Sequence, residues 1–507
     1  MRVALHAASS DCLKPIYDNE ISKEETLELV VPDVNADIGK ILDVRGQFLL
    51  SSQKAKADEV HISASVEVSI IYAADDGGKT QYIMANIPVH IMIPVMGADE
   101  NSKIVTRFEL CNLDAKTLNP RKLLIRANIS AQISCFVPDK FILWDNLPEG
   151  EKAPVHILKK EIEHTLFMGV REKSFIVSDE YKLPPEKEHN SKMLSASTNL
   201  CVDDVKAVGN KVVIKAFANT TAVFLNESDG CLFDCIFSTG FSQIIEVETY
   251  GDNVYNTVFL QIKDAEFTMV SGRENGFVCS AQFNVMAQAV SKENKCSCYV
   301  ADAYSNVYML TTETSDTKLM SCHPEKTLVM SMRGKLQSEA ELVEIMYAAV
   351  SEICTEFDAN EITCHVQVGG IGKCEGGEAE AIELKLIAQE CIALMKNQRL
   401  NIISVCCDKA AIIGTAQNAE FCVDVIIGYN IREFMDINAV NALDITDECI
   451  TKRDNHPSLI VLCSDREYDI WSLAKKYGST MDMIENANKI GDEFSIARRP
   501  LLIPRSK

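Results

Sequence analysis

Positive charge is scarce in this sequence, and the shortage excludes one class of function. The 507 residues include 50 Lys and Arg against 73 Asp and Glu, which gives a net charge of −23. Proteins that bind along nucleic acids need clustered positive charge to neutralise phosphates, so an extended nucleic-acid surface is excluded. The same acidity disfavours nonspecific attraction to anionic lipid.

Long apolar runs are also absent. No window approaches the roughly 18–20 apolar residues of a transmembrane helix, so no integral membrane association is predicted. The first eleven residues hold a lone Arg2 and lack the apolar run of about seven residues that a secretory signal needs. We therefore expect a soluble, cytoplasmic protein.

No Cys-x-x-Cys spacing occurs among the 19 cysteines. They are scattered through apolar segments, for example at Cys135, Cys279, Cys364 and Cys422. Without an export signal they are predicted to be reduced thiols in the core. Metal binding needs convergent ligands, and the pairs Cys231/Cys235 and Cys296/Cys298 have poor spacing and no nearby His. No metal site and no cofactor are predicted.

A recognisable catalytic set is missing as well. His61, His90 and His365 fall within strand patterns, with no nucleophile or carboxylate placed beside them by the sequence. The glycine-rich stretch at 369–373 fails as a phosphate-binding loop, because Gln367 and Cys374 stand where Gly and Ser or Thr are required. It is predicted to be a turn after a strand. The protein is therefore predicted not to be an enzyme, with a nucleotide-using enzyme or hydrolase in this region as a weaker alternative.

Alternating apolar and polar residues dominate what is present. Residues 60–70 alternate with the period of a half-buried strand, Asp75-Asp76-Gly77-Gly78 suits a tight turn, and alternation resumes from Gln81 to Val95. These segments predict a β-hairpin. Further strands are expected at 104–110 and 122–137, the second introduced by Asn119-Pro120-Arg121.

The same layout returns about 152 residues later. A strand at 212–224 is followed by a turn at 227–230 and by a strand that ends at 244–247, so that Ala64 corresponds to Ala216 and Tyr72 to Phe224. The polar, Pro-containing stretch at 181–190 predicts a linker or the entry to a domain. This is an internal repeat at the scale of a domain.

A third region follows residue 318 and changes in pattern. Residues 338–341 form a capping box ahead of apolar positions from Leu342 to Ile353 at helical spacing, which predicts an amphipathic helix. Strand-like stretches then occur at 361–368, 381–394, 400–405 and 421–427. We interpret residues 319–450 as a divergent third copy.

Two segments carry a family resemblance for the repeats. Residues 31–42, Val-Pro-Asp-Val-Asn-Ala-Asp-Ile-Gly-Lys-Ile-Leu, and the later Asn119-Pro120-Arg121-Lys122 resemble the most recognisable segments of the SPOCS domain family, a β-rich module of endospore-forming Firmicutes. The second copy is similar to the same family at 172–175, 181–184 and 302–305. Within the first segment, Asp33 and Asp37 are predicted to cap the turn or helix that follows them.

The C-terminus resembles a LysM domain at 467–488 and 501–504. Ile470, Leu473, Ala474 and Tyr477 share one helical face, Gly478 suits a left-handed helix end, and Ser479 with Asp482 is predicted to cap a second helix. Strands at 459–463 and 501–503 would pair in a βααβ unit.

Together the resemblances imply a clostridial spore-morphogenesis protein. They imply that the LysM module docks onto the ATP-hydrolysing morphogenetic protein of the coat basement layer, with other coat proteins as further partners, in the mother-cell cytoplasm at the forespore surface. The residues expected on the partner-binding groove and rim are Glu467, Tyr468, Trp471, Lys475, Lys476, Asn488, Arg498 and Arg499.

Two turns distinguish this module from a LysM that binds glycans. Glu467-Tyr468 and residues 497–500 replace turns that contain glycine in glycan-binding members, where the backbone approaches the sugar closely. Peptidoglycan is therefore disfavoured as a ligand, and a cell-wall protein that binds peptidoglycan is the alternative. Residues 451–507 hold ten Lys or Arg against eight Asp or Glu, leaving 40 against 65 for the rest. This cationic rim would suit an acidic protein surface, whereas the simpler interpretation is a solvated loop.

The predicted fold class is mainly β and multidomain. It comprises repeated SPOCS-like modules, sandwich-like or barrel-like, at 1–150, 151–318 and 319–450, followed by a small βααβ LysM domain at 451–507. The predicted function is a non-enzymatic scaffold or adaptor in spore-coat assembly and forespore engulfment.

Overall fold

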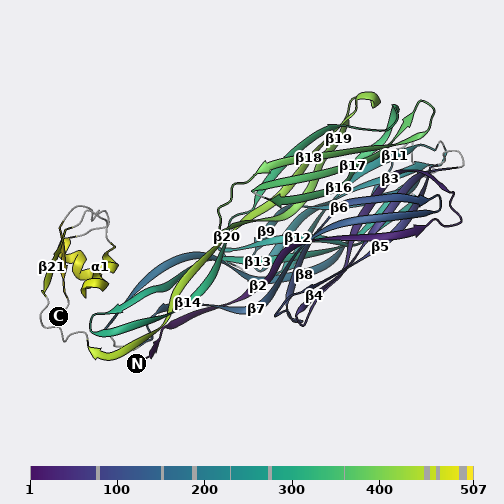
Figure 1. Cartoon of the computed structure of the whole chain (residues 1–507). Helices are drawn as coiled ribbons and strands as arrows, with labels where there is room; N and C mark the ends of the chain where they lie inside the picture. Colours follow the sequence, from purple (N-terminus) through teal and green to yellow (C-terminus); the bar gives the residue numbers. More distant parts are fainter. Residues whose placement is uncertain are drawn as a thin grey trace.

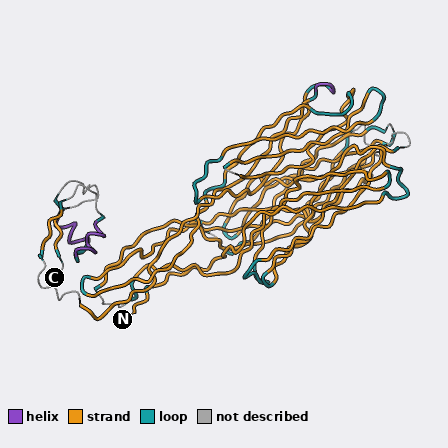
Figure 2. The backbone as a smooth tube through the Cα atoms, viewed as in Figure 1, coloured by secondary structure: helices purple, strands orange, loops and turns teal. Residues whose placement is uncertain are grey.

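The computed structural model describes residues 2–75, 80–149, 154–184, 191–228, 230–249, 251–271, 277–358, 360–449, 457–463, 469–489 and 500–505. Strands dominate, which confirms the mainly β prediction (Figure 2). Most of the predicted turn at 75–78 and Asp229 of the turn at 227–230 lie outside the described residues. None of the described helices is long and apolar enough to cross a membrane.

Six strands form the first repeat, and they make two sheets. They are β2 (His6–Val30), β3 (Ile38–Lys56), β4 (Glu59–Ala74), β5 (Thr80–Pro94), β6 (Lys103–Asn119) and β7 (Lys122–Asn146). One sheet is the antiparallel meander β3-β4-β5, and the other has the order β6-β7-β2. The predicted hairpin is β4 with β5, and the two further predicted strands lie in β6 and β7.

The core of this repeat lies between the two sheets. Alternate residues of β4, such as Val66 and Val68, are fully buried, as are alternate residues of β7, such as Ile125 and Ile129. These side chains belong to one apolar cluster, so the two sheets pack face to face as a sandwich. The period-2 pattern in the sequence is the direct consequence of this packing.

The strand order occurs a second time. The second set comprises β8 (Val155–Lys182), β9 (Ser191–Val208), β10 (Lys211–Asn226), β11 (Leu232–Glu246), β12 (Val254–Ser271) and β13 (Phe277–Ser305). The meander is β9-β10-β11, and β12-β13-β8 corresponds to β6-β7-β2. Phe224 and Phe283 are among the buried side chains that join these two sheets.

A third set has the same order, with its first strand in two pieces. It comprises β14 (Tyr308–Cys322), β15 (Lys326–Lys335), β16 (Leu342–Asp358), β17 (Glu361–Cys374), β18 (Ala379–Cys391), β19 (Gln398–Ile413) and β20 (Glu420–Cys449), with a 3-10 turn at Ala416–Asn418. The meander is β16-β17-β18, and β20 pairs with β14, β15 and β19. The N-terminal β1 (Arg2–Ala4) also pairs with β20. The sequence boundaries proposed for the modules stay predictions.

The helix predicted from residue 338 to 353 is wrong, because these residues contribute to strand β16. The ladder between β16 and β17 has register shifts at Leu342/Glu344, Ile345/Tyr347 and Val350/Glu352. Each shift changes which face the following residues present, so the apolar positions recur every three or four residues as they would in a helix. In addition, the consecutive residues Tyr347, Ala348 and Ala349 are all buried, which hides the strand period.

The glycine-rich segment is not the predicted turn but a continuation of strand β17. A Cβ added at Gly370 would lie 2.3 Å from the carbonyl oxygen of Tyr347, and one at Gly369 would lie 2.5 Å from Oδ1 of Asp43. The glycines therefore allow close approach of neighbouring strands and a buried carboxylate. This packing role explains the composition without a phosphate ligand.

The three repeats pack against one another in a closed ring. Strand β12 of the second repeat contacts β3 of the first, β19 of the third contacts β9 of the second, and β6 of the first contacts β16 of the third. Each contact thus joins the fifth strand of one repeat, counting β14 and β15 as one, to the second strand of another. Such head-to-tail contacts close after three units, as in a cyclic trimer, but within one chain.

An apolar cluster closes the ring where the three meanders meet. It takes Leu42, Leu194 and Tyr347 from the first strands of the meanders, and Ile71, Val223, Ile371 and Leu232 from the neighbouring strands. Because these residues lie on the side away from each sandwich core, the strands here are buried on both faces. The buried hydroxyl of Ser69 also donates to the carbonyl oxygen of Leu194, 2.8 Å away.

The long strands continue beyond the ring as a narrow stalk (Figure 1). The paired ends of β2 and β7, of β8 and β13, and of β14 and β20 form it, and apolar residues such as Leu143, Tyr299, Leu319 and Ile437 fill it. Every repeat begins and ends at the stalk tip, where residue 146 is followed by 155 and residue 305 by 308. The C-terminal module therefore leaves the chain at this end.

That module consists of β21 (Leu459–Leu462), α1 (Ile470–Tyr477), α2 (Met481–Asn488) and β22 (Leu501–Pro504). Strands β21 and β22 pair antiparallel, which confirms the predicted βααβ order. Gly478 ends α1 in the left-handed conformation, with a φ of 66°, as predicted. The cap of α2 differs from the prediction, because the Thr480 hydroxyl accepts the hydrogen bond from the Met483 amide.

Leu42→Ala is expected to destabilise the whole ring. Leu42 is 3% exposed in the cluster shared by all three repeats, so removing its side chain leaves a cavity and should lower the free energy of unfolding by about 2–5 kcal/mol. Urea denaturation followed by circular dichroism measures the change. The control Leu118→Ala, at a residue that is 51% exposed, should alter stability by less than about 0.5 kcal/mol. Equal stability of the two variants would contradict the shared core.

Candidate functional site

The two segments that resemble the SPOCS family lie against each other at one end of the first sandwich. The Arg121 guanidinium donates to the carbonyl oxygens of Val31 and Pro32 at 3.1 and 3.0 Å and to the Asp37 carboxylate at 2.7 Å. It also forms an ion pair with Asp33. Asp33 and Asp37 therefore hold Arg121 and do not cap a helix. The planar guanidinium suits this task because it offers several donors in fixed directions.

In the C-terminal module, local capping fixes the orientation of α1. The Asp469 carboxylate accepts hydrogen bonds from the backbone amides of Trp471 and Ser472, at 3.3 and 3.1 Å. An acidic residue is favourable there because it satisfies otherwise unpaired N–H groups and faces the positive end of the helix dipole. Trp471 and Lys475 consequently lie one turn apart on the same side of α1.

Trp471 and Lys475 converge on the stalk. The Trp471 indole Nε1 donates to Oδ2 of Asp302 at 2.8 Å, and the Lys475 ammonium donates to Oδ1 and Oδ2 of the same carboxylate at 2.7 and 2.8 Å. Asp302 belongs to β13 of the second repeat. Burial alone would raise the pKa of Asp302, but Lys475 and Trp471 together hold that pKa below its ordinary value.

The other predicted groove residues are placed differently. The Asn488 amide donates to the carbonyl oxygens of Ile484 and Leu502 and accepts from the Leu502 amide, so it ties α2 to β22 within the module. The exposed Lys476 ammonium lies 5.3 Å from the centre of the Tyr477 ring. Glu467, Tyr468, Arg498 and Arg499 lie outside the described residues.

A second candidate region is a cavity of about 620 Å³ between the three repeats. Its lining comes from β3 and β6 of the first repeat, β9 and β12 of the second, and β16 and β19 of the third, together with residues of neighbouring strands. These are the six strands that form the ring contacts, so the cavity lies where the repeats meet. No periodicity in the sequence could have shown it, because it exists only once the ring is closed.

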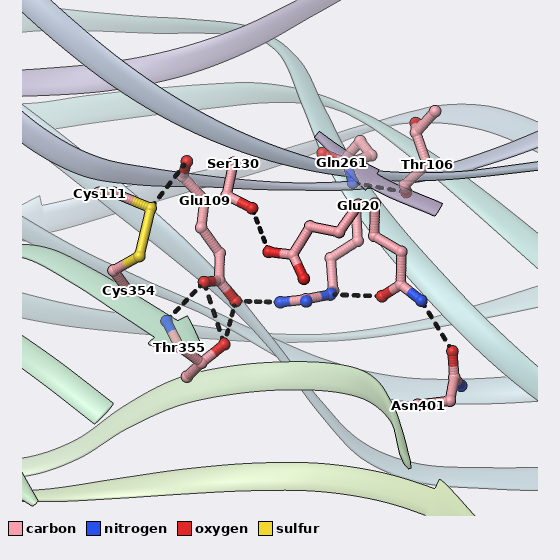
Figure 3. A network of polar contacts seen from close by, with 11 residues as sticks. Glu20, Thr106, Glu109, Cys111, Ser130, Gln261, Cys354, Thr355 and Asn401 are labelled. Carbon is pink, nitrogen blue, oxygen red and sulfur yellow. Dashed lines mark hydrogen bonds and ion pairs between the residues drawn. A yellow bond between two sulfur atoms is a disulfide. The ribbon is translucent and has the colours of Figure 1, made fainter. Parts of the chain in front are cut away.

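A polar network lines one wall of this cavity, at the contact between the first and third repeats (Figure 3). The Glu109 carboxylate on β6 pairs with Arg107 and accepts from the backbone amide and hydroxyl of Thr355 on β16, both at 2.8 Å. From Arg107 the network continues through Gln132 to Asn401 of β19, whose amide oxygen lies 2.9 Å from Nε2 of Gln132. Buried charge is thus paired and hydrogen-bonded, as stability requires.

The same contact carries a disulfide that the sequence reasoning missed. Cys111 on β6 and Cys354 on β16 are bonded across a sequence separation of 243 residues, which corrects the prediction that the cysteines are reduced core thiols. Cys135, Cys279 and Cys364 are buried free thiols as expected, whereas Cys422 is only partly buried. The pairing escaped notice because each cysteine lies in an ordinary strand pattern, far from its partner in sequence.

The disulfide sulfurs also bear on metal binding. One oxygen of Glu109 and the sulfurs of Cys111 and Cys354 lie within 4.8 Å of one another, which is close enough for three ligands to share an ion. However, thiolates are the metal ligands, and both sulfurs are bonded to each other here. The Glu109 carboxylate is also engaged by Arg107 and Thr355. The arrangement therefore supports a covalent contact between repeats.

Glu352 is the buried acid of the cavity that lacks full pairing. Its side chain accepts a hydrogen bond from the Ser351 hydroxyl at 2.6 Å, while its Oε1 has no partner among the described residues. Burial is the main reason that the pKa of Glu352 rises from an ordinary 4.5 to about 8. A protonated Glu352 avoids an unpaired charge in the cavity wall.

Comparison with known proteins bears on the first repeat. Residues 37–118 match the family model described as SipL, SPOCS domain. The chain is SipL-like. The matched segment covers the meander β3-β4-β5 and nearly all of β6, and it begins at Asp37, one of the partners of Arg121. A SPOCS domain of this kind indicates a sporulation-related protein, in keeping with the spore coat. No curated protein matches the sequence.

Removing the disulfide should weaken ring closure. Cys111→Ser is expected to lower the denaturation midpoint of the oxidised protein, by up to about 4 kcal/mol, because the bond restrains a very long loop in the unfolded chain. The difference should vanish when reductant is added. Cys296→Ser, at an exposed free thiol, is the control and should have no effect. Alkylation of both Cys111 and Cys354 in the native, unreduced protein would contradict the bond.

The buried Glu352 should make stability depend on pH. In the unfolded chain this carboxyl ionises near 4.5, whereas in the folded chain it keeps its proton to about pH 8. The folded state therefore binds the extra proton between these values, and stability should fall as the pH rises from about 4.5 to 8.

Glu352→Gln should flatten this dependence and stabilise the protein near pH 8, as judged by urea midpoints measured across that range. Glu356→Gln, at an exposed position on the same strand, is the matched control. If both variants showed the same pH profile as the parent protein, Glu352 would not be the responsible group.

Proposed function

We propose that this chain is a non-enzymatic scaffold or adaptor in spore-coat assembly and forespore engulfment. The SipL SPOCS match supports a role in sporulation. The observation that carries the adaptor role is the separation of two bodies, a ring of three sandwiches and a small C-terminal module, by a stalk of paired strands (Figure 1). Such a shape suits a protein that holds partners at a set distance.

The ring supplies the rigid part of this adaptor. Its repeats are joined by a shared apolar cluster, by the Glu109 network and by the Cys111–Cys354 bond. A rigid body loses little conformational entropy when it binds a partner, which favours assembly surfaces that stay in place. We propose that the ring provides the contacts to coat proteins.

The C-terminal module supplies the docking part. We propose that this LysM-like module binds the ATP-hydrolysing morphogenetic protein of the coat basement layer, in the mother-cell cytoplasm. Its support is the βααβ fold, together with ten Lys and Arg against eight Asp and Glu in residues 451–507 of an otherwise acidic chain. Basic side chains such as Lys475 and Lys476 suit an acidic protein surface.

The non-enzymatic part of the proposal rests on how the reactive groups are held. His164 Nε2 lies 2.9 Å from the Ser297 hydroxyl, which resembles a base beside a nucleophile. However, His164 is 2% exposed, its Nδ1 lacks a partner among the described residues, and burial lowers its pKa to about 4. A catalytic histidine needs an orienting partner and access to substrate. This pair is better explained as filling the stalk.

The docking role of the module is tested by co-purification from sporulating cells. The full-length chain should recover the basement-layer ATPase, identified by mass spectrometry, whereas a chain that ends at residue 450 should lose it. Loss is expected because the truncated chain lacks the entire proposed docking surface. Equal recovery by the two chains would show that the docking role is assigned to the wrong part.

A pulldown on purified sacculi distinguishes the cell-wall alternative. If the C-terminal module serves as a protein-binding module, the full-length chain should be retained no better than the chain that ends at residue 450. Retention that requires residues 451–507 would instead favour peptidoglycan binding.

A further inference from the structure

The C-terminal module packs on the stalk through the same helix that carries its predicted partner-binding residues. Asp302 of β13 accepts hydrogen bonds from Trp471 Nε1 and from the Lys475 ammonium, all between 2.7 and 2.8 Å. Charge-assisted hydrogen bonds of this length are among the stronger polar contacts in proteins. The carboxylate is thus held by two donors from one face of α1.

An aromatic contact lies two residues further along β13. The Tyr304 ring meets Trp471 edge-on, with 4.8 Å between ring centres, and only 5% of Tyr304 is exposed. Its hydroxyl donates to the carbonyl oxygen of Ser479 at 2.9 Å, and the side-chain amide of Asn306 donates to the same oxygen at 3.0 Å. Tyr304 is therefore part of the apolar core of the module.

Residues i and i+2 of a strand point to the same face, which explains how β13 presents both groups together. The stalk segment Asp302-Ala303-Tyr304 thus behaves like a ligand: a carboxylate for the donors of α1, and an aromatic ring for the side of Trp471. The face of α1 offers two hydrogen-bond donors at this point, one of them charged. A neutral sugar would not match that charge.

We propose that the face of α1 formed by Trp471 and Lys475 recognises a protein segment with an acidic residue followed two positions later by an aromatic residue. The chain's own Asp302 and Tyr304 occupy this face, so a partner that presents the same chemistry must displace the stalk. This inference rests on the proposed function, because it assigns the docking surface of the C-terminal module. Docking is then a competition between an internal and an external ligand.

The first experiment tests the internal contact in the full chain. Trp144 and Trp471 are the two tryptophans of the sequence, so a Trp144→Phe background leaves Trp471 as the single reporter. Asp302→Asn should shift the docking equilibrium about tenfold toward release, because a charged acceptor is lost. Acrylamide should then quench Trp471 fluorescence more strongly.

A double variant and a matched control make this result decisive. Adding Tyr304→Ala should increase quenching further, because the edge-on ring and its hydroxyl are removed. Asp316→Asn, at an exposed acid of the stalk on β14, should leave quenching unchanged. Quenching that is the same in the double variant and in the control would overturn the internal contact.

The second experiment tests what the vacant face recognises. A synthetic peptide of residues 299–308 should protect Trp471 from acrylamide in the double variant, and the same peptide with Asn in place of Asp302 should protect at least about tenfold less well. Equal protection by both peptides, or by neither, would overturn the proposed recognition of an acidic and an aromatic residue.

The third experiment links the face to partner capture. If the stalk competes with the partner, the released double variant should recover more of the basement-layer ATPase than the parent chain does. Equal recovery would overturn the competition. Failure of the parent chain and of every variant to recover that ATPase would contradict the proposed function, whereas the Trp471 measurements would still decide the internal contact.

Discussion

The contact between β6 and β16 closes the ring, and the rest of the structure depends on it. The first and third repeats are far apart in sequence, so their contact has to offset the entropy lost in closing a loop of more than 240 residues. The Glu109–Thr355 hydrogen bonds and the Cys111–Cys354 bond lie at this contact. Without closure, the apolar cluster around Leu42 and Tyr347 would be open to water and the central cavity would not exist.

Ring closure also explains where the functional parts lie. When three sandwiches meet at one end, their long strands are gathered at the other, and each repeat returns to the stalk tip. The chain therefore enters the C-terminal module from the tip, beside Asp302 and Tyr304. The contact of Trp471 with the stalk is a consequence of this topology together with the charge of Asp302.

Sequence patterns predicted much of the fold where a strand has one buried face. The alternation in β4, β5 and β10 follows from the sandwich cores, and the C-terminal caps follow from local backbone chemistry, as Gly478 shows. The prediction failed at β16, where bulges and burial on both faces produced a helical period. It failed again at the glycines of β17, whose reason is a neighbouring strand and Asp43. Of the eight proposed groove residues, sequence could name Trp471 and Lys475 but not what they contact.

The sequence by itself determined the local elements: strands with alternating burial, the repeat at about 152 residues, and the helix boundaries of the C-terminal module. These depend on residues that are near one another in the chain, so their pattern can be recognised there. The tertiary structure alone decided the ring, the disulfide, the raised pKa of Glu352 and the partner of Trp471. Each of these joins residues separated by long stretches of chain or depends on burial between repeats, and neither leaves a periodic signal in a single sequence.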